Sequence, residues 1–213
     1  IANMIYFGDA YNSDNVPENI SEEDIKFLND YIVGKESNDE KLKEIVSVDC
    51  VQPWNVLAIT FTNKAAGELK ERLENMLGEQ AQGIVAATFH STCVRILRQE
   101  IDKLGYNRSF TIYDTDDTQR LVKSCLEDLE INENMFPPRS ILSEISRQKD
   151  NMITPEEFEI QAQGDYRKLV IARIYKLYQS KLFDANAVDF DDIIKLTVKL
   201  FMDFPDVLEH YQN

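Results

Sequence analysis

In Asn55-Val-Leu-Ala-Ile-Thr-Phe61, an apolar segment typical of a buried strand leads without a break into the polar helix start Thr62-Asn-Lys-Ala-Ala66. A second segment has the same design: Ile84-Val-Ala-Ala-Thr-Phe89 leads into His90-Ser-Thr-Cys93. Strands that alternate with helices predict a parallel sheet, and such sheets bind ligands at the carboxyl ends of their strands. A helix N-terminus there also offers unpaired N–H groups to phosphate. The two junctions therefore predict a site for successive phosphates of a polynucleotide.

The overall composition is that of a globular protein large enough to bury a core. The chain has 213 residues, of which 43% are hydrophobic and 29% are charged. No apolar run approaches the roughly 20 residues that span a bilayer, and residues 1–7 lack the features of a signal peptide. We therefore expect a cytoplasmic protein without a membrane partner. Because the first residue is Ile1 rather than Met, we also expect a segment of a longer protein.

The cysteine pattern indicates free thiols. Cys50, Cys93 and Cys125 are widely spaced and form no CxxC pair. An odd number of isolated cysteines supports neither a disulfide framework nor a zinc site. We expect all three to be reduced and buried.

The net charge of −15 argues against tight binding of nucleic acid, because affinity for phosphate comes from Lys and Arg. The charge is unevenly distributed, however. Residues 1–52 contain 12 acids and 4 bases, whereas residues 53–213 contain 26 acids and 19 bases. The second part of the chain therefore leaves room for a local basic track.

Residues 8–52 have the composition of an insertion. Residues 8–19 are acidic and rich in turn formers, and Ser21-Glu-Glu-Asp24 fits a capping box at the start of a short helix. The apolar face of that helix is expected to carry Ile25, Leu28 and Ile32. A second short helix is expected over 39–47. The segment is interpreted either as a solvated excursion or as an element that docks a protein partner.

From residue 54 onward, the periodicity predicts a strand and a helix, repeated once. The two helices cover 64–77 and 90–104 and end at Gly78 and Gly105, and residues 110–113 are extended. The remainder is expected to be helical. Helices are predicted over 139–148 and 165–183, and others begin at Thr115, after Asp189 and at Pro205. A further helix begins at Pro155 and follows a capping box formed by Thr154 and Glu157.

Three carboxylates lie close together in Asp189-Phe-Asp-Asp192 and raise the question of a metal site. Asp189 as the N-cap and Asp192 three residues later would stabilise a helix start, and this is the interpretation we adopt. We therefore assign no metal ligands.

Bases and aromatic residues recur through the helical part. The aromatic residues lie at helical spacing and are interpreted as core: Tyr166, Tyr175, Tyr178 and Phe183. The bases form either a surface that faces a DNA duplex or ordinary solvated faces, and the sequence does not choose between the two: Arg139, Arg147, Lys149, Arg167, Lys168, Arg173, Lys176 and Lys181.

Four motifs occur in a distinctive order and spacing: Ile59-Thr-Phe-Thr-Asn-Lys-Ala-Ala66, Thr88-Phe-His-Ser91, Phe110-Thr-Ile-Tyr-Asp114 and Val188-Asp-Phe-Asp-Asp192. Over about residues 54–213 the chain resembles the UvrD/PcrA/Rep family of superfamily 1 DNA helicases. In these helicases ATP lies between two RecA-like domains, and its hydrolysis drives 3′-to-5′ movement along single-stranded DNA.

The resemblance implies an α/β fold in two parts. Residues 1–91 would form part of the first RecA-like domain, with a partial parallel sheet of the P-loop NTPase type and the acidic insertion at about 8–52. Residues 92–213 would form a mostly helical accessory subdomain. The expected partners of the parent protein are single-stranded DNA and single/double-strand junctions, in DNA repair or replication.

The resemblance also assigns DNA-contacting residues. The first motif gives Phe61, Thr62, Asn63 and Lys64, and the second gives Thr88, Phe89, His90 and Ser91. The helix dipole mildly disfavours a cation at the start of a helix, and a bound phosphate would explain why Lys64 is found there. Phe61 suits either core packing or stacking on a base, and His90 with Ser91 suits either an N-cap pair or a DNA contact. No catalytic residue is assigned, because nothing indicates a nucleophile paired with His90.

The chain departs from the family pattern at the ATP site. It contains no G-x-x-x-x-G-K-[ST] loop to hold phosphates and no Asp-Glu-x-Gln motif for magnesium. ATP and Mg²⁺ are therefore expected in the parent protein and no cofactor in this segment, which should be inactive alone. The alternatives are the motor part of an AddA/RecB-like helicase–nuclease and a non-catalytic protein-interaction module.

Overall fold

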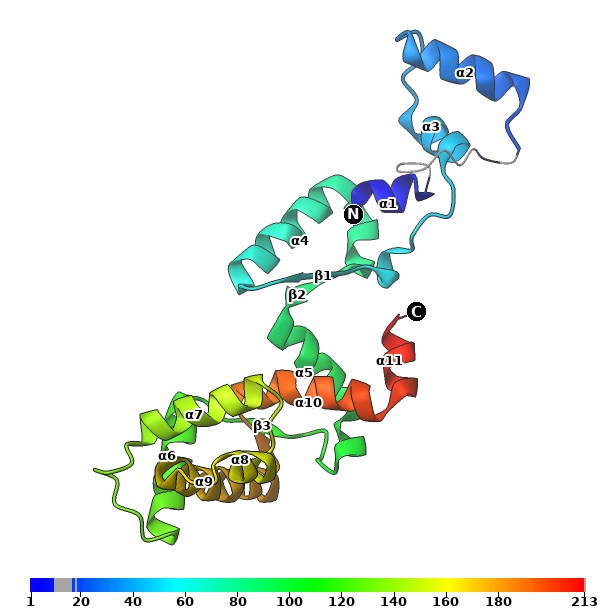
Figure 1. Cartoon of the computed structure of the whole chain (residues 1–213). Coiled ribbons are helices and arrows are strands. Elements are labelled where there is room, and N and C mark those ends of the chain that lie inside the picture. Colours follow the sequence, from blue (N-terminus) through cyan, green and yellow to red (C-terminus); the bar gives the residue numbers. More distant parts are fainter. Residues whose placement is uncertain (10–16, 18, 213) are drawn as a thin grey trace. The chain divides into compact units, whose positions relative to one another are not determined.

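A computed structural model describes residues 1–9, 17 and 19–212 (Figure 1). The chain forms two compact units, Ile1–Thr88 and Phe89–Asn213. The described residues are mostly helical and form two small parallel sheets. In the described part of the chain, no helix is both long and apolar enough to cross a membrane.

The first unit contains the predicted parallel strands. Strands β1 (Leu57–Thr60) and β2 (Val85–Thr88) pair in register from Leu57↔Val85 to Thr60↔Thr88. Helix α4 (Asn63–Leu77) and a 3₁₀ turn, η3 (Gly78–Gly83), connect them, which is the crossover that a parallel pair requires. Helix α4 ends at Gly78, whose positive φ of 59° favours glycine, as predicted. Leu73 and Leu77 of α4 pack with Val56 and Ile84 in the core of this unit.

The two ends of the predicted insertion lie next to each other in the first unit. Helix α1 (Ala2–Tyr6) is followed by Gly8, which forms a parallel bridge with Val48. A Cβ atom at Gly8 would lie 1.9 Å from the Val48 carbonyl oxygen, so glycine is required for this approach. Most of the predicted turn-rich segment, namely residues 10–16 and 18, lies outside the described residues.

Between these points the structure contains helices α2 (Glu22–Ile32) and α3 (Asp39–Val46). Both helices were predicted, and the Ser21/Asp24 capping box is confirmed. On the apolar face expected for α2, Ile25 and Ile32 are 52% and 80% exposed. Phe27 is the buried residue of α2: its ring contacts Tyr31, and Lys41 Nζ lies 4.8 Å from the ring centroid.

The second unit contains the predicted helices. They are α5 (Phe89–Glu100), α6 (Thr115–Asp128), α7 (Pro138–Asp150), α8 (Pro155–Gln161), α9 (Tyr166–Asp184), α10 (Phe190–Asp203) and α11 (Pro205–Gln212). The helix expected over 90–104 ends as a 3₁₀ turn, η4 (Ile101–Leu104), before Gly105 at φ 88°. Strand β3 (Thr111–Ile112) confirms the predicted extended segment. Its parallel partner β4 (Ala187–Val188) was not predicted, because two apolar residues carry no period.

The core of this unit surrounds α9 and the α5–α10 pair, whose helices lie side by side (Figure 1). Tyr175 and Tyr178 of α9 are fully buried, which confirms the prediction of core aromatics. Tyr166 and Phe183, at the two ends of the same helix, are 74% and 46% exposed, and their assignment to the core was wrong. The buried residues of α9 lie between Val170 and Leu182, and Arg173 and Lys176 on the same stretch remain exposed.

Candidate nucleic-acid interface

The ends of β1 and β2 form one edge of the first sheet. Because Thr60 is the register partner of Thr88, the segments that follow the two strands start from neighbouring positions. Phe61 comes directly after Thr60 and is 87% exposed, so its interpretation as a core residue is wrong. An exposed phenylalanine at the carboxyl edge of a parallel sheet provides a flat apolar surface for a ligand.

Thr62 and Lys64 have distinct roles at the start of α4. Thr62 is the N-cap, and its Oγ1 accepts a hydrogen bond from the backbone N–H of Ala65 at 3.1 Å. Asn63 and Lys64 are the first two helical residues, and both are exposed. Lys64 Nζ lies 3.9 Å from Glu68 Oε1 in a pair whose side chains are 87% and 57% exposed. Such a pair contributes little to stability, so Lys64 can exchange Glu68 for a phosphate.

The second junction passes from β2 into α5 without a turn. Thr88 ends β2 and is buried, whereas Phe89 begins α5 and is 43% exposed. His90 and Ser91 are the second and third residues of α5, which places them inside the helix and not at its cap. The N-cap interpretation of this pair is therefore wrong.

His90 contacts an aromatic residue that the sequence analysis did not assign to the site. The rings of His90 and Phe190 lie 5.2 Å apart between centroids, at an interplanar angle of 50°. Phe190 is the first residue of α10 and is 56% exposed. The signal in the sequence is the aromatic residue that stands between the acids of Val188-Asp-Phe-Asp-Asp192.

The predicted site residues thus fall in two groups. Phe61, Thr62, Asn63, Lys64 and Thr88 belong to the first unit, where the strand pairing brings them to one edge. Phe89, His90 and Ser91 belong to the second unit, where His90 meets Phe190.

Under the start of α10 lies a buried cluster of charges. Lys149 of α7 has a side chain with 0% exposure, and its Nζ lies 2.6 Å from Asp189 Oδ2 and 2.8 Å from Asp192 Oδ1. Lys149 is therefore neither a solvated base nor part of a DNA-facing surface, and both interpretations of it were wrong. Asp189 is the N-cap of α10 and forms a capping box with Asp192, as predicted.

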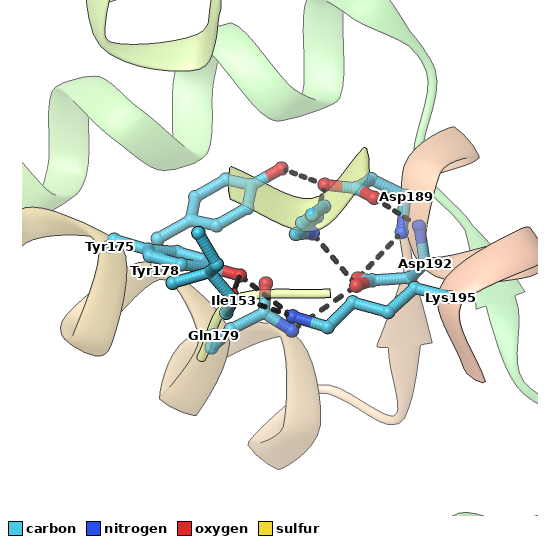
Figure 2. Close-up of polar contacts among 8 residues, drawn as sticks. Ile153, Tyr175, Tyr178, Gln179, Asp189, Asp192 and Lys195 are labelled. Atoms are coloured by element: carbon cyan, nitrogen blue, oxygen red, sulfur yellow. Dashed lines mark hydrogen bonds and ion pairs between the residues drawn. The ribbon is translucent and has the colours of Figure 1, made fainter. Parts of the chain in front are cut away.

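Each oxygen of the two carboxylates has a defined partner. Asp189 Oδ1 accepts the backbone N–H of Asp192 at 2.9 Å, and Asp192 Oδ2 accepts the backbone N–H of Asp189 at 3.3 Å. The other oxygen of each faces Lys149. Figure 2 shows the Tyr178 hydroxyl, which donates to Asp189 Oδ2 at 2.8 Å, and the Gln179 amide, which donates to Asp192 Oδ1 at 3.3 Å.

This arrangement sets the charges in the cluster. Burial alone would lower the pKa of Lys149, but Asp192 and Asp189 outweigh it and hold the pKa above its ordinary value. Burial opposes ionisation of Asp189 as well, yet Lys149 and the hydrogen bonds keep its pKa below the ordinary range. Burial and the Asp189 charge raise the pKa of Asp192. In residues 1–9, 17 and 19–212, no group of three or more His, Cys, Asp or Glu side chains could hold a metal ion.

Comparisons with known proteins identify relatives of this chain. Residues 40–213 match the family described as UvrD/REP helicase N-terminal domain. The chain is 50% identical over 163 residues to the ATP-dependent DNA helicase PcrA of Bacillus subtilis. The aligned stretch covers 76% of this chain and 22% of the relative. It is 46% identical over the same length to the PcrA helicases of Staphylococcus epidermidis and Staphylococcus aureus. The chain thus spans about a fifth of the length of these relatives, 22% in each case.

Proposed function

This chain belongs to the UvrD/REP helicase family, and we propose that it forms part of an ATP-dependent helicase that moves 3′-to-5′ on single-stranded DNA in repair or replication. The parent protein uses ATP and Mg²⁺ in a cytoplasmic setting and acts on single strands and their junctions with duplex. The chain itself has no phosphate-binding loop, so ATP hydrolysis depends on residues outside it.

One observation carries the DNA-binding part of this proposal. The Thr60↔Thr88 register aligns the ends of β1 and β2, so that two polar helix starts follow from one sheet edge. Lys64 and the first N–H groups of α4 suit a phosphate, and Phe61 suits a base. In the second unit the His90–Phe190 pair offers a further aromatic surface to the strand.

We assign residues 1–91 to part of a RecA-like domain and residues 92–213 to the helical accessory subdomain. Support for the first assignment comes from the parallel β1–α4–β2 unit, and support for the second from the helical composition after Phe89. Both assignments follow the family to which the chain belongs.

A second function, docking of a protein partner, is proposed for the segment that carries α2. Ile25 and Ile32 are exposed on this helix, and the family match begins only at residue 40. Exposed apolar residues in a segment outside the family match favour contact with another protein.

Replacement of aromatic residues in the complete protein tests the DNA site. Phe61→Ala should lower the affinity for a labelled oligonucleotide by about 5-fold to 150-fold, since stacking contributes about 1–3 kcal/mol per base. Tyr166→Ala is the matched control, because Tyr166 is 74% exposed but lies on α9, away from both junctions in sequence. Fluorescence anisotropy at fixed salt is the measurement. Equal affinities for the two variants would contradict the proposed site.

A further inference from the structure

We propose that Lys149 is a positioning residue for the surface formed by His90 and Phe190: it fixes the cap of α10 and thereby the ring of Phe190 against His90. This inference rests on the proposed function only where it concerns DNA. The structural part concerns the second unit alone and can be tested separately.

The path from Lys149 to the surface is short. Lys149 Nζ lies 2.6 Å from Asp189 Oδ2 and 2.8 Å from Asp192 Oδ1, so one cation forms ion pairs with both members of the capping box. Phe190 lies between these two aspartates in the chain and directly follows the N-cap. Its backbone is therefore held from both sides, and its ring contacts His90 of the adjacent helix α5.

The other capping boxes in the described part of the chain show that a cap does not need such a cation. Ser21/Asp24, Asp114/Asp117 and Thr154/Glu157 form the same reciprocal bonds at exposed positions. Arg120 pairs with Asp117, but its side chain is 73% exposed. Lys149 is thus an addition to what the cap of α10 requires, and it ties that cap to α7.

A buried ion pair adds little net stability, and in some proteins it instead fixes one arrangement of the groups around it. Here the carboxylate oxygens all have partners, so a shift of the α10 start would break several contacts together. This rigidity holds an exposed aromatic pair in one geometry, as a binding surface requires.

The test uses two variants, of which the double variant conserves the buried net charge. Lys149→Met with Asp192→Asn removes one positive and one negative charge, and leaves Asp189 as the N-cap with its bonds from Tyr178 and from the backbone. Asp192→Asn alone keeps the side-chain shape, removes one of the two ion pairs, and serves as a milder form. Lys195→Met is the matched control, because Lys195 donates hydrogen bonds to the Tyr175 hydroxyl and the Ile153 carbonyl in the same region and not to Asp189 or Asp192 of the α10 cap (Figure 2).

The first readout is the proton resonance of the His90 ring, which the neighbouring Phe190 ring shifts. The chain has two histidines, so His210 is an internal reference. In the folded double variant and in folded Asp192→Asn the His90 resonance should move toward its position in Phe190→Ala, whereas Lys195→Met should leave it unchanged. An unchanged His90 resonance in folded Asp192→Asn and in the double variant would overturn the proposal.

The second readout is affinity for an oligonucleotide in the complete protein. The double variant should lose affinity to about the same extent as Phe190→Ala, with Lys195→Met close to the unsubstituted protein. If His90→Ala and Phe190→Ala leave affinity unchanged, the proposed DNA contact at this surface fails, and the resonance alone decides whether Lys149 positions Phe190. If both lower affinity while the double variant does not, the positioning role in DNA binding is overturned.

Discussion

Lys149 and Asp189 are 40 residues apart in the sequence, yet Lys149 Nζ lies 2.6 Å from Asp189 Oδ2 in the interior of the second unit. The contact joins the end of α7 to the start of α10. Both side chains are buried, with exposures of 0% and 7%. Each charge therefore depends on the other.

Removal of the cation alone should be costly. Lys149→Met leaves Asp189 and Asp192 buried without their counter-ion, and loss of one partner from a buried pair costs about 3–5 kcal/mol of the free energy of unfolding. Urea unfolding of the chain, followed by circular dichroism, measures this loss. Adding Asp192→Asn should recover part of it, because the buried net charge returns to its original value. A loss below about 1 kcal/mol for Lys149→Met would contradict a buried, charged cluster.

The cluster also predicts how stability depends on alkaline pH. Burial, and then the Asp189 charge, raise the pKa of the Tyr178 hydroxyl well above its ordinary value. Above pH 10.0, the ordinary value, the unfolded chain releases this proton and the folded chain keeps it, so stability falls as pH rises. Lys149, whose pKa is also raised, acts in the same direction: its contribution is complete below 10.5 and is lost as pH rises through the folded value.

Tyr178→Phe isolates one of these contributions. Where the unfolded chain has lost a proton that the folded chain keeps, the free energy of unfolding falls by about 1.4 kcal/mol for each pH unit. The variant should therefore lose stability less steeply, by about that amount, between about pH 10 and pH 11.5. Denaturant unfolding at a series of pH values gives the slope, and identical slopes for the two proteins would show that Tyr178 ionises in the folded state.

Local sequence signals predicted the helix starts well. Ser21, Thr154 and Asp189 each precede an acid by three residues, and each forms the expected capping box. These signals work because a cap is a contact between residues three apart, so the sequence contains both partners in one window. The same reasoning would have found Asp114/Asp117, which the structure also shows.

What the sequence could not predict depends on distant partners. Nothing near Lys149 indicates burial, since its two counter-ions lie about 40 residues further along the chain. Strand β4 is two residues long and owes its existence to pairing with β3. Phe27, the buried residue of α2, likewise has a partner on another helix, because Lys41 Nζ of α3 lies 4.8 Å from its ring centroid.

The three cysteines should differ in reactivity, although the sequence predicted the same state for all. Cys125 is 0% exposed, and burial raises the pKa of its thiol to about 11. Cys50 and Cys93 are only half-buried. Because the thiolate is the reactive form, iodoacetamide at about pH 8 should label Cys125 only when the chain unfolds. Peptide mapping after labelling with and without urea gives the order in which the three cysteines react. Labelling of Cys125 in the folded chain as fast as Cys50 would contradict its place in the core.

Lys64 offers the sharpest separation of binding from stability, because the chain contains a matched lysine. Lys64 and Lys70 lie on the same helix, and each forms an exposed pair with a glutamate four residues later, at 3.9 Å and 3.8 Å. Alanine at either position should change the free energy of unfolding by no more than about 0.5 kcal/mol.

In the complete protein, Lys64→Ala should remove about one phosphate contact and make the dependence of log affinity on log salt shallower by about 0.7 to 1, while Lys70→Ala should not. Lys64→Ala should also weaken the stimulation of ATPase activity by DNA and leave the basal rate unchanged. If the two variants bind DNA alike across the salt series, the first turn of α4 holds no phosphate, and the proposed path of the strand over the β1–β2 edge is wrong.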